Sequence, residues 1–459
     1  LATEVPTLDN GGIVVAADGQ SMVVTYHLRD GVKWADGAPF TSADVKFTWE
    51  AIKDPNYLGP EKDGTEEIDS IETPDDLTVV IHYNKVYPGF KASLFTYGVL
   101  PKHALEGKDL NKDPFWDAPF GTGPFMVTEF KRGQHVIVER NPYYFETDAN
   151  GVQLPYLDRI VFQIIPNSNT QTTQLRSGEV GFAYNVPNTA LPTLQNVATL
   201  NVIMAKTLAF RHLTFNLANE LLNDLAVRQA FAHAIDRTAL NRALGDYMLP
   251  IDTFVVSTFP FAATDVPTYA YDPELAKKIL ADAGFKPGRD GVLERDGKRL
   301  SFSFMTQAGR AEYETAQQVI MAQLKAVGVE LTPDNKAGAA LSEARRNGGF
   351  DVWYSGWITP ADPIDSYVSF YATGGFNNGG AYSNPATDEA LYAAAGSLDP
   401  AVVAENMHTA QVLVATDIPM IPLFETPSII VTTSKLEGFE SNPTNQSNFR
   451  LPAGWWLNQ

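Results

Sequence analysis

The chain of 459 residues contains no cysteine. This absence excludes thiol nucleophiles, iron–sulfur clusters and zinc sites that are built on thiolates. It also suits an oxidising compartment, because there is no free thiol to be oxidised. No run of apolar residues approaches the roughly 18 that are needed to cross a bilayer, so the sequence predicts no membrane-spanning helix.

Common catalytic motifs are missing as well. The sequence has no Gly-x-Ser-x-Gly elbow, Ser-x-x-Lys, His-Glu-x-x-His, Walker loop or Gly-x-Gly-x-x-Gly. The seven histidines are scattered without metal-ligand spacing, so we expect no metal site and no cofactor. Asp362 and Asp365 are close carboxylates in an aromatic setting. They keep open a second hypothesis, a two-lobed hydrolase or transferase.

Acidic residues outnumber basic ones by 54 to 34, which gives a formal charge of −20. Binding to a phosphate backbone depends on cationic side chains, so a nucleic acid is not expected as a partner. An acidic surface keeps a protein soluble, and it can also attract a cationic ligand. The 44% apolar and 11% aromatic content is that of a folded chain, and the length predicts two or three lobes.

Hydrophobic periodicity predicts a mixed α/β fold. Alternation of apolar and polar residues indicates strands at 21–28, 77–83, 135–139 and 160–165, and a buried strand at 349–354. Helical spacing predicts helices at 41–52, 223–244, 272–284 and 313–328. The third helix is the best delimited, with Asp272 as its N-cap, Pro273 in its first turn and Gly284 just beyond its end.

Two proline-rich or β-branched stretches, 247–267 and 421–433, are candidate crossings between lobes. We therefore expect a β-rich subdomain at 1–158, the remainder of the first lobe at 159–252 and 431–459, and a second lobe at 253–430. Two strands that join two lobes form a hinge.

Aromatic residues beside small polar ones mark the candidate ligand site. The segment 353–363 is expected to form a loop after the strand at 349–354, and loops at strand ends bind ligands in many α/β proteins. Trp357 and Asp362 are the lead pair. In the alternative interpretation, Trp357 covers a core and Asp362 opens a turn before Pro363.

A second loop, 370–380, contains Phe376 and Asn377 among glycines. It could become ordered over a ligand, or it could be a solvated turn. Weaker candidates for ligand contact are Tyr184, Asn185, Arg211, Tyr97 and Tyr354.

The segment 27–45, His-Leu-Arg-Asp-Gly-Val-Lys-Trp-Ala-Asp-Gly-Ala-Pro-Phe-Thr-Ser-Ala-Asp-Val, resembles the signature of the extracellular solute-binding proteins, family 5, of peptide-type ABC importers. Further segments resemble the family in the same order along the chain: 121–125, 140–144, 227–237, 271–284, 382–388 and 421–423. The resemblance therefore covers essentially the whole chain.

The resemblance implies a large, peptide-binding, type II periplasmic-binding-protein-like fold, in which two lobes joined by a hinge enclose a ligand. It implies a non-enzymatic protein that captures a peptide or peptide-like solute and delivers it to an ABC permease. The expected location is the periplasm or the extracellular face, with a lipid anchor in the latter case, and the expected state is a monomer.

One departure from the family pattern concerns the ligand. Peptide-binding members carry an aspartate a few residues after the tryptophan that matches Trp357, and it binds the peptide ammonium. Here Ile358-Thr359-Pro360-Ala361 precedes Asp362, and that acid is absent. Because an unpaired buried ammonium is costly, opines, sugars and other small solutes stay open as alternatives.

Overall fold

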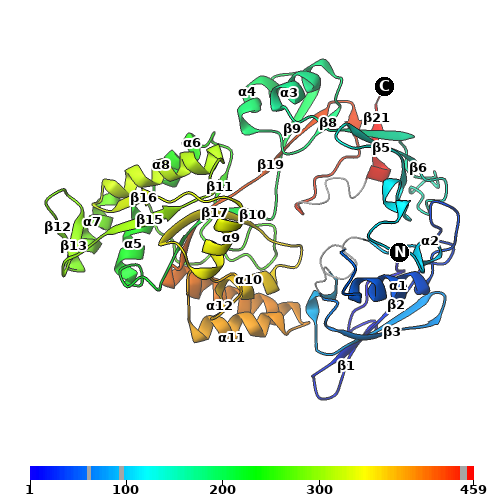
Figure 1. The fold of residues 1–459 in the computed structure, drawn as a ribbon, viewed down its shortest axis with the longest axis horizontal. Helices are drawn as coiled ribbons and strands as arrows, with labels where there is room; N and C mark the ends of the chain where they lie inside the picture. Colours follow the sequence, from blue (N-terminus) through cyan, green and yellow to red (C-terminus); the bar gives the residue numbers. More distant parts are fainter. Residues whose placement is uncertain (59–63, 92–97, 445–451, 459) are drawn as a thin grey trace. The chain divides into compact units, whose positions relative to one another are not determined.

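The computed structural model describes residues 1–58, 64–91, 98–444 and 452–458 (Figure 1). The chain forms two compact units, and each is described here by itself. The first comprises residues 1–203, 430–441 and 447–459, and the second comprises residues 204–429 and 442–446. Among the described residues, no helix has the length and the apolar character needed to span a bilayer.

This division differs from the expected lobes mainly at one boundary, and residues 442–446, expected in the first lobe, belong to the second unit. The chain first enters the second unit at residue 204, whereas the sequence placed that crossing at 252/253. The reason is strand pairing, because β10 and β11 both pair with β18 in the main sheet of the second unit. The return at residue 430 lies one residue from the expected boundary. The changes of unit at 203/204 and 429/430 fall within strands β9 (Leu200–Ala205) and β19 (Ser428–Thr433), which belong to one three-stranded sheet.

The first unit is built on small sheets with the strand orders β1-β2-β4-β3, β5-β6-β7, β8-β19-β9 and β20-β21. Its strands are β1 (Ile13–Val15), β2 (Met22–His27), β3 (Ile68–Asp75), β4 (Thr78–Tyr83), β5 (Phe125–Lys131), β6 (His135–Arg140), β7 (Arg159–Gln163), β8 (Phe182–Ala183), β9 (Leu200–Ala205), β19 (Ser428–Thr433), β20 (Leu436–Glu437) and β21 (Trp456–Leu457). Its helices are α1 (Ser42–Lys53), α2 (Lys102–Leu105), α3 (Ser168–Ser177) and α4 (Leu191–Leu194). The strands expected at 21–28, 77–83, 135–139 and 160–165 and the helix expected at 41–52 are confirmed.

The second unit has a six-stranded sheet with the order β11-β18-β10-β17-β15-β16, and a small sheet β12-β13-β14. Its strands are β10 (Ala209–Phe215), β11 (Leu249–Pro250), β12 (Lys286–Pro287), β13 (Leu293–Arg295), β14 (Lys298–Arg299), β15 (Ser301–Met305), β16 (Glu330–Pro333), β17 (Val352–Ile358) and β18 (Met420–Glu425). Its helices are α5 (Leu225–Ala234), α6 (Arg237–Ala243), α7 (Pro273–Asp282), α8 (Ala311–Lys325), α9 (Gly338–Asn347), α10 (Ile364–Tyr371), α11 (Pro385–Ala395) and α12 (Pro400–Asp417).

The helix expected at 223–244 is wrong as a single element. The chain leaves helical geometry at Ile235 (φ −90°, ψ 109°), and a second helix, α6, begins at Arg237. The carboxylate of Asp236 accepts a hydrogen bond from the Ala239 N–H at 2.9 Å, so Asp236 is the N-cap of α6. An aspartate that caps a new helix competes with continuation of the old one.

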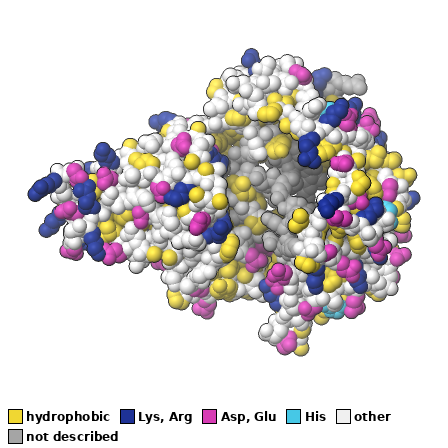
Figure 2. Space-filling view, in the orientation of Figure 1, with side chains coloured by type: hydrophobic (Ala, Val, Ile, Leu, Met, Phe, Trp, Pro, Cys, Tyr) yellow, Lys and Arg dark blue, Asp and Glu magenta, His cyan; other side chains and the backbone are white. Residues whose placement is uncertain are grey.

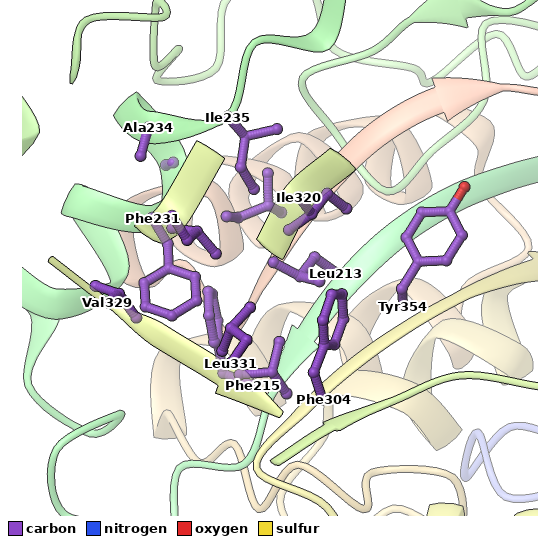
Figure 3. Close-up of a cluster of buried hydrophobic side chains, with 14 of the residues drawn as sticks. Leu213, Phe215, Phe231, Ala234, Ile235, Phe304, Ile320, Val329, Leu331 and Tyr354 are labelled. Atoms are coloured by element: carbon purple, nitrogen blue, oxygen red, sulfur yellow. The ribbon is translucent and has the colours of Figure 1, made fainter. Parts of the chain in front are cut away.

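The two faces of the six-stranded sheet are covered by different helices, because successive side chains of a strand point to opposite faces. Leu213 and Phe215 of β10 and Tyr354 of β17 lie in a buried cluster together with residues of α5, α6, α7 and α8 (Figure 3). Phe210 of β10 lies in a second cluster, with residues of α10, α11 and α12. Trp353 of β17 packs with Ala344 of α9 in a third.

Charges of both signs are interspersed on the face of the molecule seen in Figure 2. Around the β12–β14 sheet, basic side chains are paired: Lys298 with Glu220, Arg299 with Asp290 at 2.6 Å and Arg295 with Asp224 at 2.8 Å. The net negative charge is therefore not gathered into one acidic patch on this visible face.

The break before α6 has a direct test. We expect Asp236→Ala to lower the free energy of unfolding by about 1 kcal/mol, because the N–H of Ala239 loses its acceptor. Asp236→Asn keeps a capping oxygen and should retain most of that stability. Urea unfolding of the two variants measures the difference, and equal losses in both would contradict the capping role.

Candidate functional site

Strand β17 extends to Ile358, four residues beyond the strand expected from the sequence. It does so because β10 pairs with it in antiparallel register along its full length, from Phe215 opposite Val352 to Ala209 opposite Ile358. Trp357, expected on a loop, is therefore a strand residue directly opposite Phe210. The same alternation puts Trp353 and Trp357 on one face of the sheet.

Four rings gather on this face, and we call them the Trp357 cluster: Trp353, Trp357, Phe370 and His212. Trp357 stacks on Phe370 of α10, with ring centroids 4.1 Å apart. It also stacks on His212 of β10 at 5.9 Å and meets Trp353 edge-on at 5.7 Å. Trp357 is partly buried and packs against the core, so its ring is held in place while part of its surface stays accessible. We call this surface the aromatic wall.

His212 is fully buried behind Trp357. Burial and the neighbouring Arg211 lower the pKa of His212 to about 3. Its Nδ1 lies 2.8 Å from the Thr214 hydroxyl, and its Nε2 has no hydrogen-bond partner among the described residues. The imidazole ring is therefore neutral at physiological pH. It contributes an aromatic surface to the cluster and no positive charge.

A small cavity of about 30 Å³ lies beside the cluster. Its lining includes Trp353, Trp357, Phe370, Arg345 and the loop residues 377–380. The loop lies directly on α9, since a Cβ at Gly379 would overlap the carbonyl oxygen of Arg345. Only glycine fits at this approach, which accounts for part of the glycine richness of the loop.

The loop candidates Phe376 and Asn377 differ in how they are held. Phe376 is 73% exposed, the most exposed large apolar side chain of the second unit among the described residues. Asn377 lines the cavity, and its side-chain amide donates to the Ser369 hydroxyl at 2.9 Å. Phe376 thus offers apolar surface to a partner, while Asn377 is positioned by α10.

Asp362 lies at the turn that opens α10. Its carboxylate accepts from the Ile364 N–H at 3.4 Å, in keeping with the alternative in which it shapes this turn. Asp365 is exposed in the first turn of α10. Both carboxylates belong to the short segment between β17 and the body of α10.

Arg211 and Tyr354 lie on the opposite face of the sheet from Trp357. Arg211 pairs with Glu312 of α8 at 2.9 Å, and its guanidinium lies 5.1 Å from the ring centroid of Tyr313. Tyr354 is fully buried in the cluster shared with Leu213 (Figure 3). The structure therefore does not bring these two candidates together with Trp357.

The remaining candidates belong to the first unit. Tyr184 is 47% exposed just after β8, and Asn185 follows it with a left-handed backbone (φ 52°). Tyr97 lies outside the described residues.

Sequence reasoning missed Arg345 and His212 as neighbours of Trp357. The guanidinium carbon of Arg345 lies 5.0 Å from the Trp357 ring centroid. His212 is remote from Trp357 in the sequence, and Arg345 lies on the helix just before β17, so strand pairing and helix packing were needed to reveal the contacts. Within the described ranges, no group of three or more His, Asp or Glu is placed to hold a metal ion.

The chain matches the family model described as bacterial extracellular solute-binding proteins, family 5 Middle, over residues 12–379. The chain belongs to this family of solute-binding proteins.

Named relatives agree with this assignment. The oligopeptide-binding protein AppA of Bacillus subtilis is 29% identical over 100% of this chain and 83% of its own length. Its structure in complex with a nonapeptide has a TM-score of 0.73 at 28% identity, covering 97% of this chain and 89% of that one. NikZ of Campylobacter jejuni, in complex with Ni(L-His), has a TM-score of 0.75 at 26% identity, covering 96% and 89%.

The burial of neutral His212 predicts a pH dependence of stability. The unfolded chain binds a proton on this residue below about pH 6.5, whereas the folded protein does not until about pH 3. The contribution of His212 to stability is therefore lost as the pH falls through this window, by up to about 1.4 kcal/mol per pH unit.

The test compares wild type with His212→Phe, which cannot be protonated. From pH 7 to pH 5, the free energy of unfolding of wild type should fall by about 2 kcal/mol more than that of the variant. Parallel pH profiles in urea unfolding would show that His212 is not buried in its neutral form.

Proposed function

We propose that this protein is the extracytoplasmic binding component of an ABC importer and that it takes a peptide or peptide-like solute at the Trp357 cluster. The observation that carries the proposal is the combination of the Trp357 cluster with the exposed Phe376, whose neighbour Asn377 lines the cavity beside the cluster. Aromatic faces supply apolar contact area, and amide side chains such as that of Asn377 orient a polar backbone.

Peptide is the solute class favoured by the relatives, since AppA of Bacillus subtilis is named an oligopeptide-binding protein. The missing acid after Trp357 leaves opines, sugars and other small solutes as the second candidate class. Mass spectrometry of the material that copurifies with the protein distinguishes these classes directly.

The proposal includes a membrane permease as the partner, capture without turnover, a periplasmic or surface-anchored location and a monomeric state. A two-lobed hydrolase using Asp362 and Asp365 is the alternative from another class. Incubation with an equimolar tripeptide pool separates them, because a binding protein gives a saturable change in tryptophan fluorescence and a hydrolase gives free amino acids.

Phe376 provides the cleanest test of the site. We expect Phe376→Ala to weaken binding of the tightest peptide recovered from the tripeptide pool by about 1–3 kcal/mol, or roughly 5- to 150-fold in Kd, as for an aromatic anchor. The melting temperature should hardly change, because the side chain is 73% exposed. Isothermal titration calorimetry and thermal unfolding give the two numbers.

The matched control is Tyr392→Ala, which removes an aromatic side chain that is 55% exposed on α11 of the same unit. It should leave the Kd unchanged. An equal loss in both variants, or no loss in either, would place the solute elsewhere.

The expectation that the solute is enclosed by two lobes has a test in solution. A ligand shifts a conformational equilibrium only if it prefers one state, so a bound peptide should favour the more compact form. We expect a saturating peptide to reduce the radius of gyration in small-angle X-ray scattering. Superimposable profiles with and without peptide would count against closure.

A further inference from the structure

Arg345, near the end of α9, has a buried guanidinium Nε–H that finds no acceptor among the residues the structure describes. Its guanidinium carbon lies 5.0 Å from the ring centroid of Trp357. Its Nε is buried and has no hydrogen-bond partner, and the group makes no ion pair with any residue that the structure describes. The guanidinium therefore stacks on the face of the indole, but its buried Nε–H donates no hydrogen bond within the described part of the chain.

Two buried arginines of the same unit, Arg211 and Arg228, do have acceptors. Arg211 pairs with Glu312, and Arg228 donates to the carbonyl oxygens of Asp417 and Leu222 at 2.7–2.9 Å. A partly buried donor without an acceptor costs free energy, and more so when it is charged. The chain has 54 acidic residues, so the lack of a carboxylate at Arg345 does not reflect a shortage of acids.

The electrostatic surroundings of Arg345 favour an anion. Burial and the neighbouring Arg346 both lower the pKa of Arg345, since both disfavour a further positive charge. An anion brought to the guanidinium would relieve both effects. The fork of the guanidinium matches a planar carboxylate, to which it can donate two parallel hydrogen bonds.

The cavity beside Arg345 limits the size of the group that can enter. Its volume of about 30 Å³ accommodates one small polar group, and its lining contains Trp353, Trp357 and Asn377 as well as Arg345. The Asp and Glu side chains of the chain are absent from this lining. A carboxylate at the end of a larger solute fits these conditions.

We propose that Arg345, stacked on Trp357, binds a carboxylate group of the solute. This inference rests on the proposed function and deepens it, because it assigns the solute a negative charge. Arg345 is then a specificity-determining residue, and Trp357 contributes both an apolar wall and the platform that orients the guanidinium.

The experiment uses two tripeptide pools that lack Asp and Glu, one with free carboxylates and one with C-terminal amides. Wild type should bind the acid pool at least about 10-fold more tightly than the amide pool, as expected for a charge-assisted hydrogen-bonded pair. Arg345→Gln should lower affinity for the acid pool by about 10- to 100-fold and abolish the preference. Arg345→Lys keeps the positive charge but not the forked guanidinium, so it should retain part of the preference for the acid pool.

Arg346→Gln is the matched control, since it removes the same charge from the adjacent, exposed position of α9. The affinity of this variant for the acid pool should stay within about twofold of the wild-type affinity. Equal binding of the two pools by wild type, or an equal loss in the two glutamine variants, overturns the inference. If neither pool binds, the proposed peptide function fails. Succinate is then titrated into wild type and into Arg345→Gln. The inference predicts that wild type binds succinate and that Arg345→Gln binds it more weakly, and equal binding or no binding overturns it.

Discussion

The pairing of β10 with β17 determines what lies on each face of the main sheet of the second unit. Phe210 is opposite Trp357, and Thr214 is opposite Trp353. Because side chains alternate, this register puts His212 on the same face as both tryptophans and sends Arg211 and Tyr354 to the other. A shift of β17 by one residue would move Trp353 and Trp357 to the face that holds Arg211 and would separate them from His212.

Gly356 shows why this register is specific. A Cβ at this position would lie 2.5 Å from Arg211 Nη1 and 2.9 Å from the carbonyl oxygen of Phe210. The glycine therefore makes room for the buried guanidinium directly opposite it in β10. The strand expected from the sequence ended at Tyr354, before this glycine, whereas β17 continues through it to Ile358. The glycine serves close packing and does not end the strand.

Local signals in the sequence predicted local structure well. Asp272, Pro273 and Gly284 delimit α7 as expected, with the carboxylate of Asp272 accepting from the Leu275 N–H at 2.9 Å. The break at Asp236 was missed because the apolar spacing of Phe231 and Ile235 continues up to it without interruption. The contact of Trp357 with His212 depends on pairing between segments that are far apart in the sequence, and its contact with Arg345 depends on how α9 packs against β17, so neither could be predicted.

The protein as a whole is negatively charged, whereas the candidate site carries a positive charge. Ionic screening limits how far the overall charge acts. A net charge of −20 repels an anionic solute at long range, but at physiological ionic strength this repulsion is screened beyond about 8 Å. Among the residues that line the cavity, Arg345 is the charged one. The acid that would bind an ammonium after Trp357 is missing, and an unpaired guanidinium stands over the same ring. If the solute binds here as proposed, both differences favour an anionic group of the solute over a cationic one.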